Sequence, residues 1–149
     1  AGVANGRAEF GPRALGNRSL LADPREISTK DLVNTIKKRE KFRPFAPAIL
    51  EEHCHDWFDM PDHSRYMSYT YQCTRPDDIP ACIHYDKSAR VQTVPKDSES
   101  ILRPILEAWY EETGCPVLLN TSLNIKGKPM VNNWQDAIDF SRLYNVSVF

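Results

Sequence analysis

Residues 116–124 read Pro-Val-Leu-Leu-Asn-Thr-Ser-Leu-Asn, an apolar stretch that runs directly into hydrogen-bonding side chains. The apolar part, residues 116–120, predicts a buried strand. Just before it, apolar residues recur on one helical face: Ile101, Leu102, Ile105, Leu106 and Trp109. Pro104 fits the first turn of this helix if the helix starts near Ser100, and Gly114 suits its C-terminal end. The strand is therefore expected to follow a helix directly.

Further elements are expected on both sides of this strand. Residues 126–129 predict a turn, and Asn133 is expected to cap a last helix over residues 134–143. Earlier in the chain, Ser28 and Asp31 suggest a capping box at the start of a helix that ends before Phe42.

Strands are expected at residues 45–50, 66–71 and 89–94, because these stretches are apolar or alternate in polarity. Residues 51–62 predict a short helix or loop. Residues 6–25, rich in Gly, Pro and Arg, predict mostly loop with one short helical turn. Strands interleaved with helices at these spacings indicate an α/β or α+β sheet domain.

The composition is that of one globular domain. The chain has 149 residues, 41% of them hydrophobic, and a net charge of -1. This charge balance gives no general attraction to nucleic acid or membranes, so an anion site must be built from local clusters of basic residues. No stretch is long and apolar enough to cross a bilayer. The four cysteines are scattered without a C-x-x-C pair, which favours reduced thiols in a cytoplasmic protein.

Three stretches concentrate polar groups. Residues 6–19 hold three arginines among three glycines, which suits a phosphate-binding loop, or else an exposed basic loop paired with Glu9. Residues 36–47 place basic side chains where a helix ends and a strand begins, although a solvated helix face would explain several of them. Residues 120–124, Asn-Thr-Ser-Leu-Asn, can bind a nucleotide or simply form a turn.

Two other groups of residues are weaker candidates. His53 and His55 flank Cys54, but neighbouring positions point apart and no second pair stands at zinc-finger spacing, so no metal site is predicted. Cys115, at the start of a strand, is expected to be a buried apolar residue rather than a nucleophile.

Taken together, the motifs resemble one family, the O-carbamoyltransferases of nodulation factors, cephalosporins and aminoglycosides (the NodU/CmcH type). The matching text covers nearly the whole chain in order: Gly-Arg-x-Glu-Phe-Gly-Pro-Arg-Ala-Leu-Gly-x-Arg-Ser at 6–19, Asp-Pro-Arg at 23–25, Asn-x-x-Ile-Lys-x-Arg-Glu-x-Phe-Arg-Pro-Phe-Ala-Pro ending at 47, His84-x-Asp86, Ala-Arg-Val-Gln-Thr-Val at 89–94, and Gly-x-Pro-Val-x-x-Asn-Thr-Ser-x-Asn at 114–124. The family's C-terminal domain is similar to YrdC, which carries Lys-x-Arg and Ser-x-Asn motifs. Here these are Lys37-x-Arg39 and Ser122-x-Asn124.

The resemblance implies a YrdC-like twisted mixed β-sheet flanked by helices. It also implies two parts for this chain: a Gly/Arg-rich interdomain segment at 1–25 and a carbamoyl-adenylate-forming domain at 26–149. The chain lacks an initial Met and opens almost at once in a dense motif, so we expect a fragment of a larger two-domain enzyme. The other part would be an N-terminal actin/Hsp70-like domain that carries the family's metal-binding histidines and carbamoylates a small hydroxyl acceptor.

The implied reaction joins a carbamoyl group to ATP, with Mg²⁺ as a companion of ATP, and forms carbamoyl-adenylate and pyrophosphate. Catalysis would rest on Lys37, Arg39 and Arg90 at the phosphates. The ligands ATP and carbamoyl phosphate would also be bound by a wider set of residues: Arg13, Arg18, Arg43, Asn120, Thr121, Ser122 and Asn124. We expect the loop at 6–19 to be mobile, or held by a bound phosphate or sulfate.

Two departures from the family pattern add positive charge near these motifs. Lys87 stands where the family usually has Gly, and Lys128 where it usually has Glu, which affects the expected nucleotide preference. The alternative function is a nucleotide- or nucleic-acid-binding YrdC-like module without catalysis of its own, although the net charge of -1 argues against strong binding to a nucleic-acid backbone.

Overall fold

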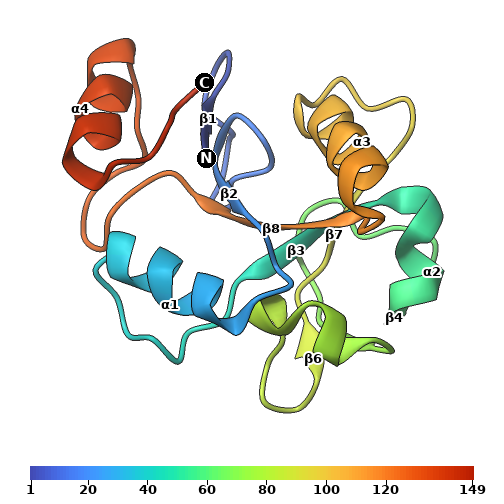
Figure 1. Ribbon diagram of the computed structural model, residues 1–149. Coiled ribbons are helices and arrows are strands. Elements are labelled where there is room, and N and C mark those ends of the chain that lie inside the picture. The colour runs from blue at the N-terminus through green and yellow to red at the C-terminus, as the bar shows by residue number, and fades with distance from the viewer.

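A mixed five-stranded β-sheet forms the centre of the computed structural model, which describes residues 1–149 (Figure 1). In spatial order its strands are β1 (Gly2–Ala4), β2 (Arg18–Ala22), β8 (Val117–Ser122), β3 (Ala46–Leu50) and β7 (Gln92–Val94). Neighbouring strands run antiparallel except β3 and β7, which are parallel. The strand predicted from residues 116–120 is therefore the central strand of this sheet.

A second, smaller sheet lies beside the first. Its strands are β4 (Phe58–Asp59), β5 (Tyr71–Cys73) and β6 (Ser88–Ala89), all antiparallel. The α-helices are α1 (Ile27–Ile36), α2 (Cys54–Trp57), α3 (Leu102–Thr113) and α4 (Trp134–Tyr144), and the 3₁₀ helices are η1 (Glu51–His53), η2 (Pro76–Asp78) and η3 (Pro80–Cys82). No helix is both long and apolar enough to cross a membrane.

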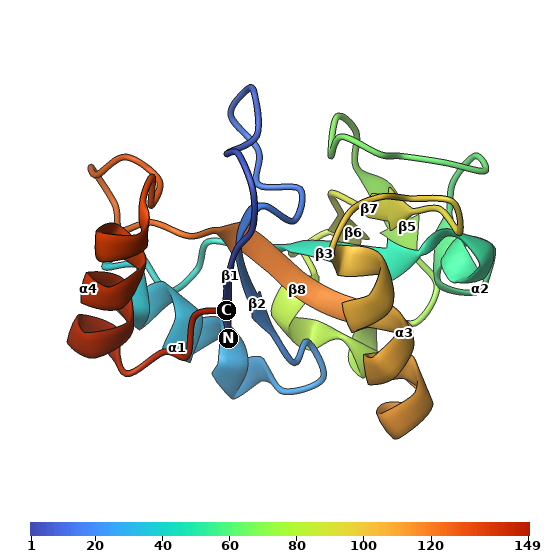
Figure 2. The ribbon, with the colours of Figure 1, turned by 90° about the horizontal axis from the view of Figure 1, so that it is seen from above.

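Helices cover both faces of the main sheet. Figure 2 shows α1 and α4 together on one side and α3 on the other. Successive residues of β8 point to opposite faces, as the pleat of a strand requires: Leu119 packs in the cluster that contains α4, and Leu118 in the cluster that contains α3. The expected fold class, a mixed sheet flanked by helices, is confirmed.

Several predicted elements are confirmed because their signals are local. Helix α3 holds Pro104 in its first turn and ends at Gly114, whose φ of 70° is the left-handed conformation that glycine adopts without strain. Asn133 caps α4 in a full capping box with Asp136. The strand expected at residues 45–50 is β3.

Four local predictions are wrong. The stretch at 6–25, expected to be mostly loop with one short helical turn, is irregular over residues 6–17 but then forms the buried strand β2 and no helical turn. Helix α1 begins at Ile27 with Glu26 as its N-cap and no side-chain capping bond, so Ser28 does not start a capping box. Only Tyr71 of the strand expected at 66–71 lies in a strand.

The fourth correction concerns residues 89–94, which do not form one strand. Ala89 pairs with Tyr71 in the small sheet, whereas Gln92 pairs with Ala48 in the main sheet. The chain therefore leaves one sheet and enters the other at Arg90 and Val91. This transition places Arg90 at the boundary between the two sheets.

Candidate anion-binding site

A pocket of about 130 Å³ opens at the end of β8, under the loop at residues 12–14 and beside the segment that follows α1. It brings together six residues that the sequence predicts for ligand binding: Arg13, Arg39, Arg90, Asn120, Thr121 and Ser122. Its other lining residues are Pro12, Ala14, Pro44, Phe45, Ala46 and Met67. We call this the arginine pocket.

The arginine pocket carries uncompensated positive charge. Three arginines line it and no acidic residue does. Burial lowers the pKa of Arg90, and the neighbouring Arg13 lowers it further. Burial also lowers the pKa of Arg39 to about 10, with Arg43 and Arg90 adding repulsion and Glu40 opposing it. An anion that entered the pocket would relieve this repulsion.

One donor in the pocket has no partner within the protein. Arg90 Nε is buried and forms no hydrogen bond. Because buried polar groups are almost always paired, an orphaned guanidinium N–H next to two other arginines indicates a site that a ligand completes. Arginine suits such a ligand best when it is a phosphate or carboxylate, whose oxygens match the guanidinium fork.

Arg39 is held in place by Asn34, a fully buried residue of α1. Arg39 Nε donates to Asn34 Oδ1 at 2.5 Å, and the Asn34 amide nitrogen donates to the carbonyls of Lys41 and Arg43 at 3.1 and 3.0 Å. The guanidinium also stacks on Phe45, with its carbon 4.2 Å from the ring centroid. Asn34 thus has two roles: it shapes the segment after α1, and it orients Arg39.

The loop that carries Arg13 is tied to the sheet by two buried side chains. Asn120 Nδ2 donates to the Ala14 carbonyl at 3.1 Å and to Gln92 Oε1 at 2.7 Å. Gln92 Nε2 in turn donates to the Leu15 carbonyl at 3.3 Å. Glu9 accepts from the amides of Leu15 and Asn17. These hydrogen bonds tie the loop to the sheet from within the chain.

The comparisons with known proteins agree with this picture. The family model for the carbamoyltransferase C-terminus matches residues 1–149. The nodulation protein NolO of Bradyrhizobium diazoefficiens is 43% identical over 143 residues, covering 92% of this chain and 26% of that protein. The nodulation protein U of Rhizobium tropici is 42% identical over 144 residues, covering 95% of this chain and 25% of that protein.

This chain belongs to the carbamoyltransferase C-terminal family. It is also similar to a protein of Methanocaldococcus jannaschii that is described as uncharacterised, 41% identical over 92% of this chain and 27% of that protein. The chain spans about a quarter of the length of the curated relatives it matches. The domain described here is thus comparable to one part of each longer relative.

In this carbamoyltransferase domain, Lys37 lies behind the arginine pocket rather than in its lining. Its ammonium donates to the carbonyls of Ser122 and Asn124 and to Asn124 Oδ1. Burial lowers the pKa of Lys37 to about 7, with a smaller contribution from Arg39. Lys37 therefore fixes the end of β8 from beneath, and its catalytic role stays a prediction.

Arg18 is a structural residue of the domain. It is buried, and all five of its N–H groups donate to backbone carbonyls, those of Asn5, Gly6, Asn17, Val131 and Asn132. No donor remains for the ligand contact that the sequence suggests. The arginine count of the loop at 6–19 therefore overstates the positive charge available to a ligand.

Arg43 and Asn124 also lie outside the pocket lining. Arg43 is exposed and stands 3.6 Å from Glu40. Asn124 bonds Lys37 and donates to the Lys128 carbonyl at 3.0 Å. Both residues neighbour the arginine pocket without lining it.

Two residues that the sequence analysis gave no role support the pocket, namely Asn34 and Gln92. Both stand inside the motifs that carry the family resemblance, but nothing in those motifs shows which side chains are buried. Asn34 and Val33 are the buried residues of α1, and a buried polar side chain such as that of Asn34 needs hydrogen-bond partners.

The pocket lining does not fit a metal ion on its own. Mg²⁺ prefers oxygen ligands, chiefly carboxylates and phosphates, and the lining contains no carboxylate. A Mg²⁺ ion that accompanies ATP would therefore be held by the phosphates of the nucleotide rather than by this pocket.

Proposed function

We propose that the arginine pocket binds the phosphate groups of ATP and of carbamoyl phosphate, and that the domain forms carbamoyl-adenylate. The observation that carries this proposal is the convergence of Arg13, Arg39 and Arg90 on one small pocket without a carboxylate. The carbamoyl part of the proposal is supported by the family to which the chain belongs, the carbamoyltransferase C-terminus. A hydroxyl acceptor would be carbamoylated by the remainder of a full-length protein, since the relatives are about four times longer.

The chemistry asks mainly for positioning and charge stabilisation. Carbamoyl phosphate loses its phosphate to water, and a carbamate oxygen then attacks the α-phosphorus of ATP. The new O–P bond forms as the bond to the β-phosphate breaks, and pyrophosphate leaves with the electron pair. Negative charge grows on the phosphoryl oxygens and on the leaving group, where fixed guanidinium groups stabilise it.

The side chains at the end of β8 complete the pocket. Thr121 and Ser122 place hydroxyl groups in its lining, and Asn120 Oδ1 is buried without a partner. Hydroxyl groups donate to phosphate oxygens, and an unpaired amide oxygen accepts from a carbamoyl N–H. The lining can therefore recognise both ends of a carbamoyl phosphate molecule.

Calorimetry with ATP and with carbamoyl phosphate tests the proposal. Arg90→Ala should weaken the binding of each ligand by about 1.5–3 kcal/mol, the contribution of one charge-assisted hydrogen bond. Arg142→Ala removes an exposed arginine from α4 and serves as the matched control. Unchanged affinity for both ligands in Arg90→Ala and Arg39→Ala would reject the assignment of the pocket.

The reaction itself is tested by mass spectrometry on the full-length protein supplied with ATP and carbamoyl phosphate. Carbamoyl-adenylate and pyrophosphate should form in the wild type and be reduced in Arg90→Ala. Pyrophosphate release that does not depend on carbamoyl phosphate would argue for a different nucleotide reaction.

A further inference from the structure

A second, larger groove lies next to the arginine pocket and shares Pro44 with it. Its volume is about 510 Å³. Residues from three parts of the chain line it, including Lys30 on α1, Phe42 after that helix, and His84 and Tyr85 before β6. We call it the Phe42–Tyr85 groove.

Exposed apolar side chains gather along this groove. Ile27, Phe42 and Tyr85 are 59%, 78% and 106% exposed, and all three line it. Large apolar side chains that share one groove and face solvent indicate a ligand or partner surface. Two of them are aromatic, which suits a flat ring as the ligand.

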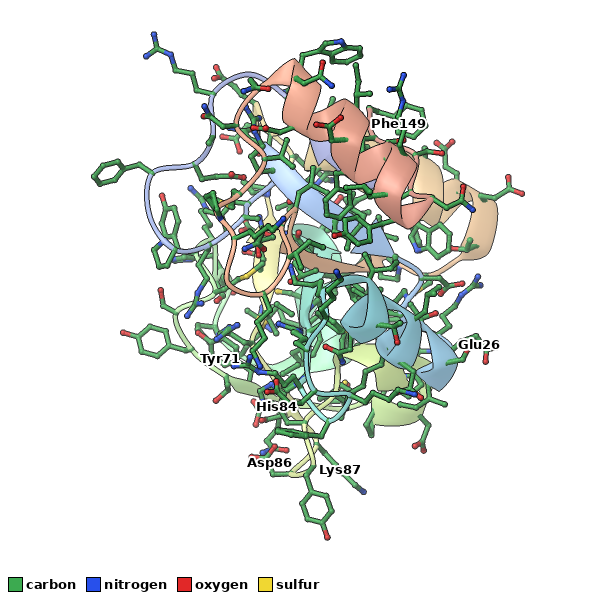
Figure 3. The ribbon with its side chains drawn as sticks, turned by 90° about the vertical axis from the view of Figure 1, so that its left-hand side faces the viewer. Glu26, Tyr71, His84, Asp86, Lys87 and Phe149 are labelled. Carbon is green, nitrogen blue, oxygen red and sulfur yellow. The ribbon has the colours of Figure 1, made fainter.

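The hydrogen bonds around His84 determine which of its ring nitrogens carries the proton. Ser88 Oγ donates its only proton to Asp86 Oδ1 at 2.7 Å, because a carboxylate can only accept. The contact of 3.1 Å between Ser88 Oγ and His84 Nδ1 must then be a bond in which Nδ1–H donates. Figure 3 shows His84 and Asp86 close together at one end of the molecule, with Lys87 beside them.

His84 Nε2 is consequently a bare acceptor. Nδ1 holds the proton of the neutral ring, and Nε2 forms no hydrogen bond within the protein. Burial lowers the pKa of His84; Asp86 opposes this effect, and Arg90 and Lys30 lower the pKa further, so the surroundings favour the neutral ring. The groove thus offers aromatic faces together with an imidazole acceptor, and its lining also includes the carboxylate of Asp77.

The position of the groove relates it to the phosphate site. The arginine pocket, at about 130 Å³, equals a few water volumes of ~30 Å³ each, so it holds phosphate groups but not a whole nucleotide. Arg90 lines that pocket and acts electrostatically on His84 in the groove. Lys30 and Lys87 add positive charge along the groove itself, and Asp77 adds one negative charge.

We propose that the Phe42–Tyr85 groove binds the adenine base of the nucleotide whose phosphates occupy the arginine pocket, with His84 Nε2 accepting a hydrogen bond from the exocyclic amine. This inference rests on the proposed function and adds the base to it. The His84–Ser88–Asp86 chain selects for an amine, because a base with a carbonyl at the same position would bring two acceptors together.

Inosine triphosphate is the sharpest probe, since it differs from ATP by that carbonyl. Wild-type protein should bind ATP at least about tenfold more tightly than inosine triphosphate, because the bound inosine base covers His84 Nε2 without offering it a donor. His84→Ala should remove this difference. His84→Gln, which retains an acceptor, should keep part of it and guards against a folding defect in the alanine variant.

The stacking role of the groove is tested with Phe42→Ala. This exposed side chain can be removed without disturbing the core. Its loss should lower the affinities for ATP and for inosine triphosphate alike by roughly tenfold. Inorganic triphosphate, which has no base, should bind equally well to the wild type, Phe42→Ala and His84→Ala. The exposed His63 provides the control variant His63→Ala, which should behave as the wild type.

The outcomes separate this inference from the proposed function. If triphosphate binds and Arg90→Ala weakens it, while ATP and inosine triphosphate bind equally to the wild type, the base does not lie at His84 and the inference is overturned. If neither triphosphate nor ATP binds to the wild type, the proposed function and the inference both fail.

Discussion

Lys37 Nζ donates to Asn124 Oδ1 at 2.9 Å and so joins two residues that stand 87 positions apart. One follows α1 and the other follows β8, and each belongs to a different motif of the family resemblance. The two motifs are therefore one physical unit at the base of the arginine pocket. The charge state of Lys37 then affects the stability of that unit.

Stability should depend on pH through Lys37. Its pKa is about 7 in the folded protein and 10.5 in the unfolded chain, so between these values the unfolded state binds more protons. The free energy of unfolding therefore rises with pH in this window, with a contribution that approaches about 1.4 kcal/mol per pH unit. Below pH 7 both states are protonated and the contribution is flat.

Urea unfolding of the wild type and Lys37→Met at several pH values from 7 to 10 would measure this contribution. The difference between their free energies of unfolding should change with pH, because only the wild type carries the group. Lys41→Met, at an exposed position, is the control and should follow the wild type. Parallel pH profiles for wild type and Lys37→Met would contradict the prediction.

Arg18→Ala should destabilise the protein by on the order of 3 kcal/mol, since five backbone carbonyls lose their donors. Arg7→Ala, an exposed arginine in the same loop, should change stability by less than about 0.5 kcal/mol. Thermal or urea unfolding measures both. If Arg18→Ala left the free energy of unfolding nearly unchanged, water molecules would have to replace the guanidinium group as donors to these carbonyls.

Lys87→Gly should stabilise the protein by about 1 kcal/mol. Lys87 has a φ of 63°, a left-handed conformation that is costly for a residue with a Cβ atom. The left-handed backbone fits the glycine that the family resemblance implies at this position. Lys96→Gly is the matched control, because Lys96 is exposed without a positive φ and should lose rather than gain stability.

Asn34 should influence anion binding through Arg39. In the wild type, Asn34→Ala should weaken pyrophosphate binding, because Arg39 loses the acceptor that orients it. In an Arg39→Ala background the same change should cost at least about 1 kcal/mol less, which calorimetry on the four proteins would show. Equal costs in both backgrounds would mean that Asn34 acts only on overall stability.

The sequence predicted those elements whose signals lie within a few residues. Gly114 ends α3 through its left-handed backbone and Asn133 starts α4 through its side-chain capping bond, so local signals predict both helices. The sequence does not predict β2, because this strand is stabilised by pairing with a distant segment: Leu21 pairs with Asn120 of β8. Arg and Gly residues around it suggested a loop instead.

The candidate site was predictable by residue type but not by geometry. Arg13, Arg39 and Arg90 were chosen as phosphate ligands and do line one pocket. Arg18 looked equivalent to Arg13, yet its acceptors include the carbonyls of Val131 and Asn132, more than 100 residues away. Which arginines keep free donors is decided by contacts of this kind, and a sequence pattern does not contain them.

The central position of β8 affects how the domain folds during its synthesis. Both partners of β8 are synthesised long before it: β2 ends at Ala22 and β3 at Leu50, whereas β8 begins at Val117. On the ribosome these two strands must wait with unpaired edges, which are sites for aggregation. Such long-range pairing also gives the domain a high contact order and slow folding. The arginine pocket, built on the end of β8, can take shape only after nearly the whole domain has left the ribosome.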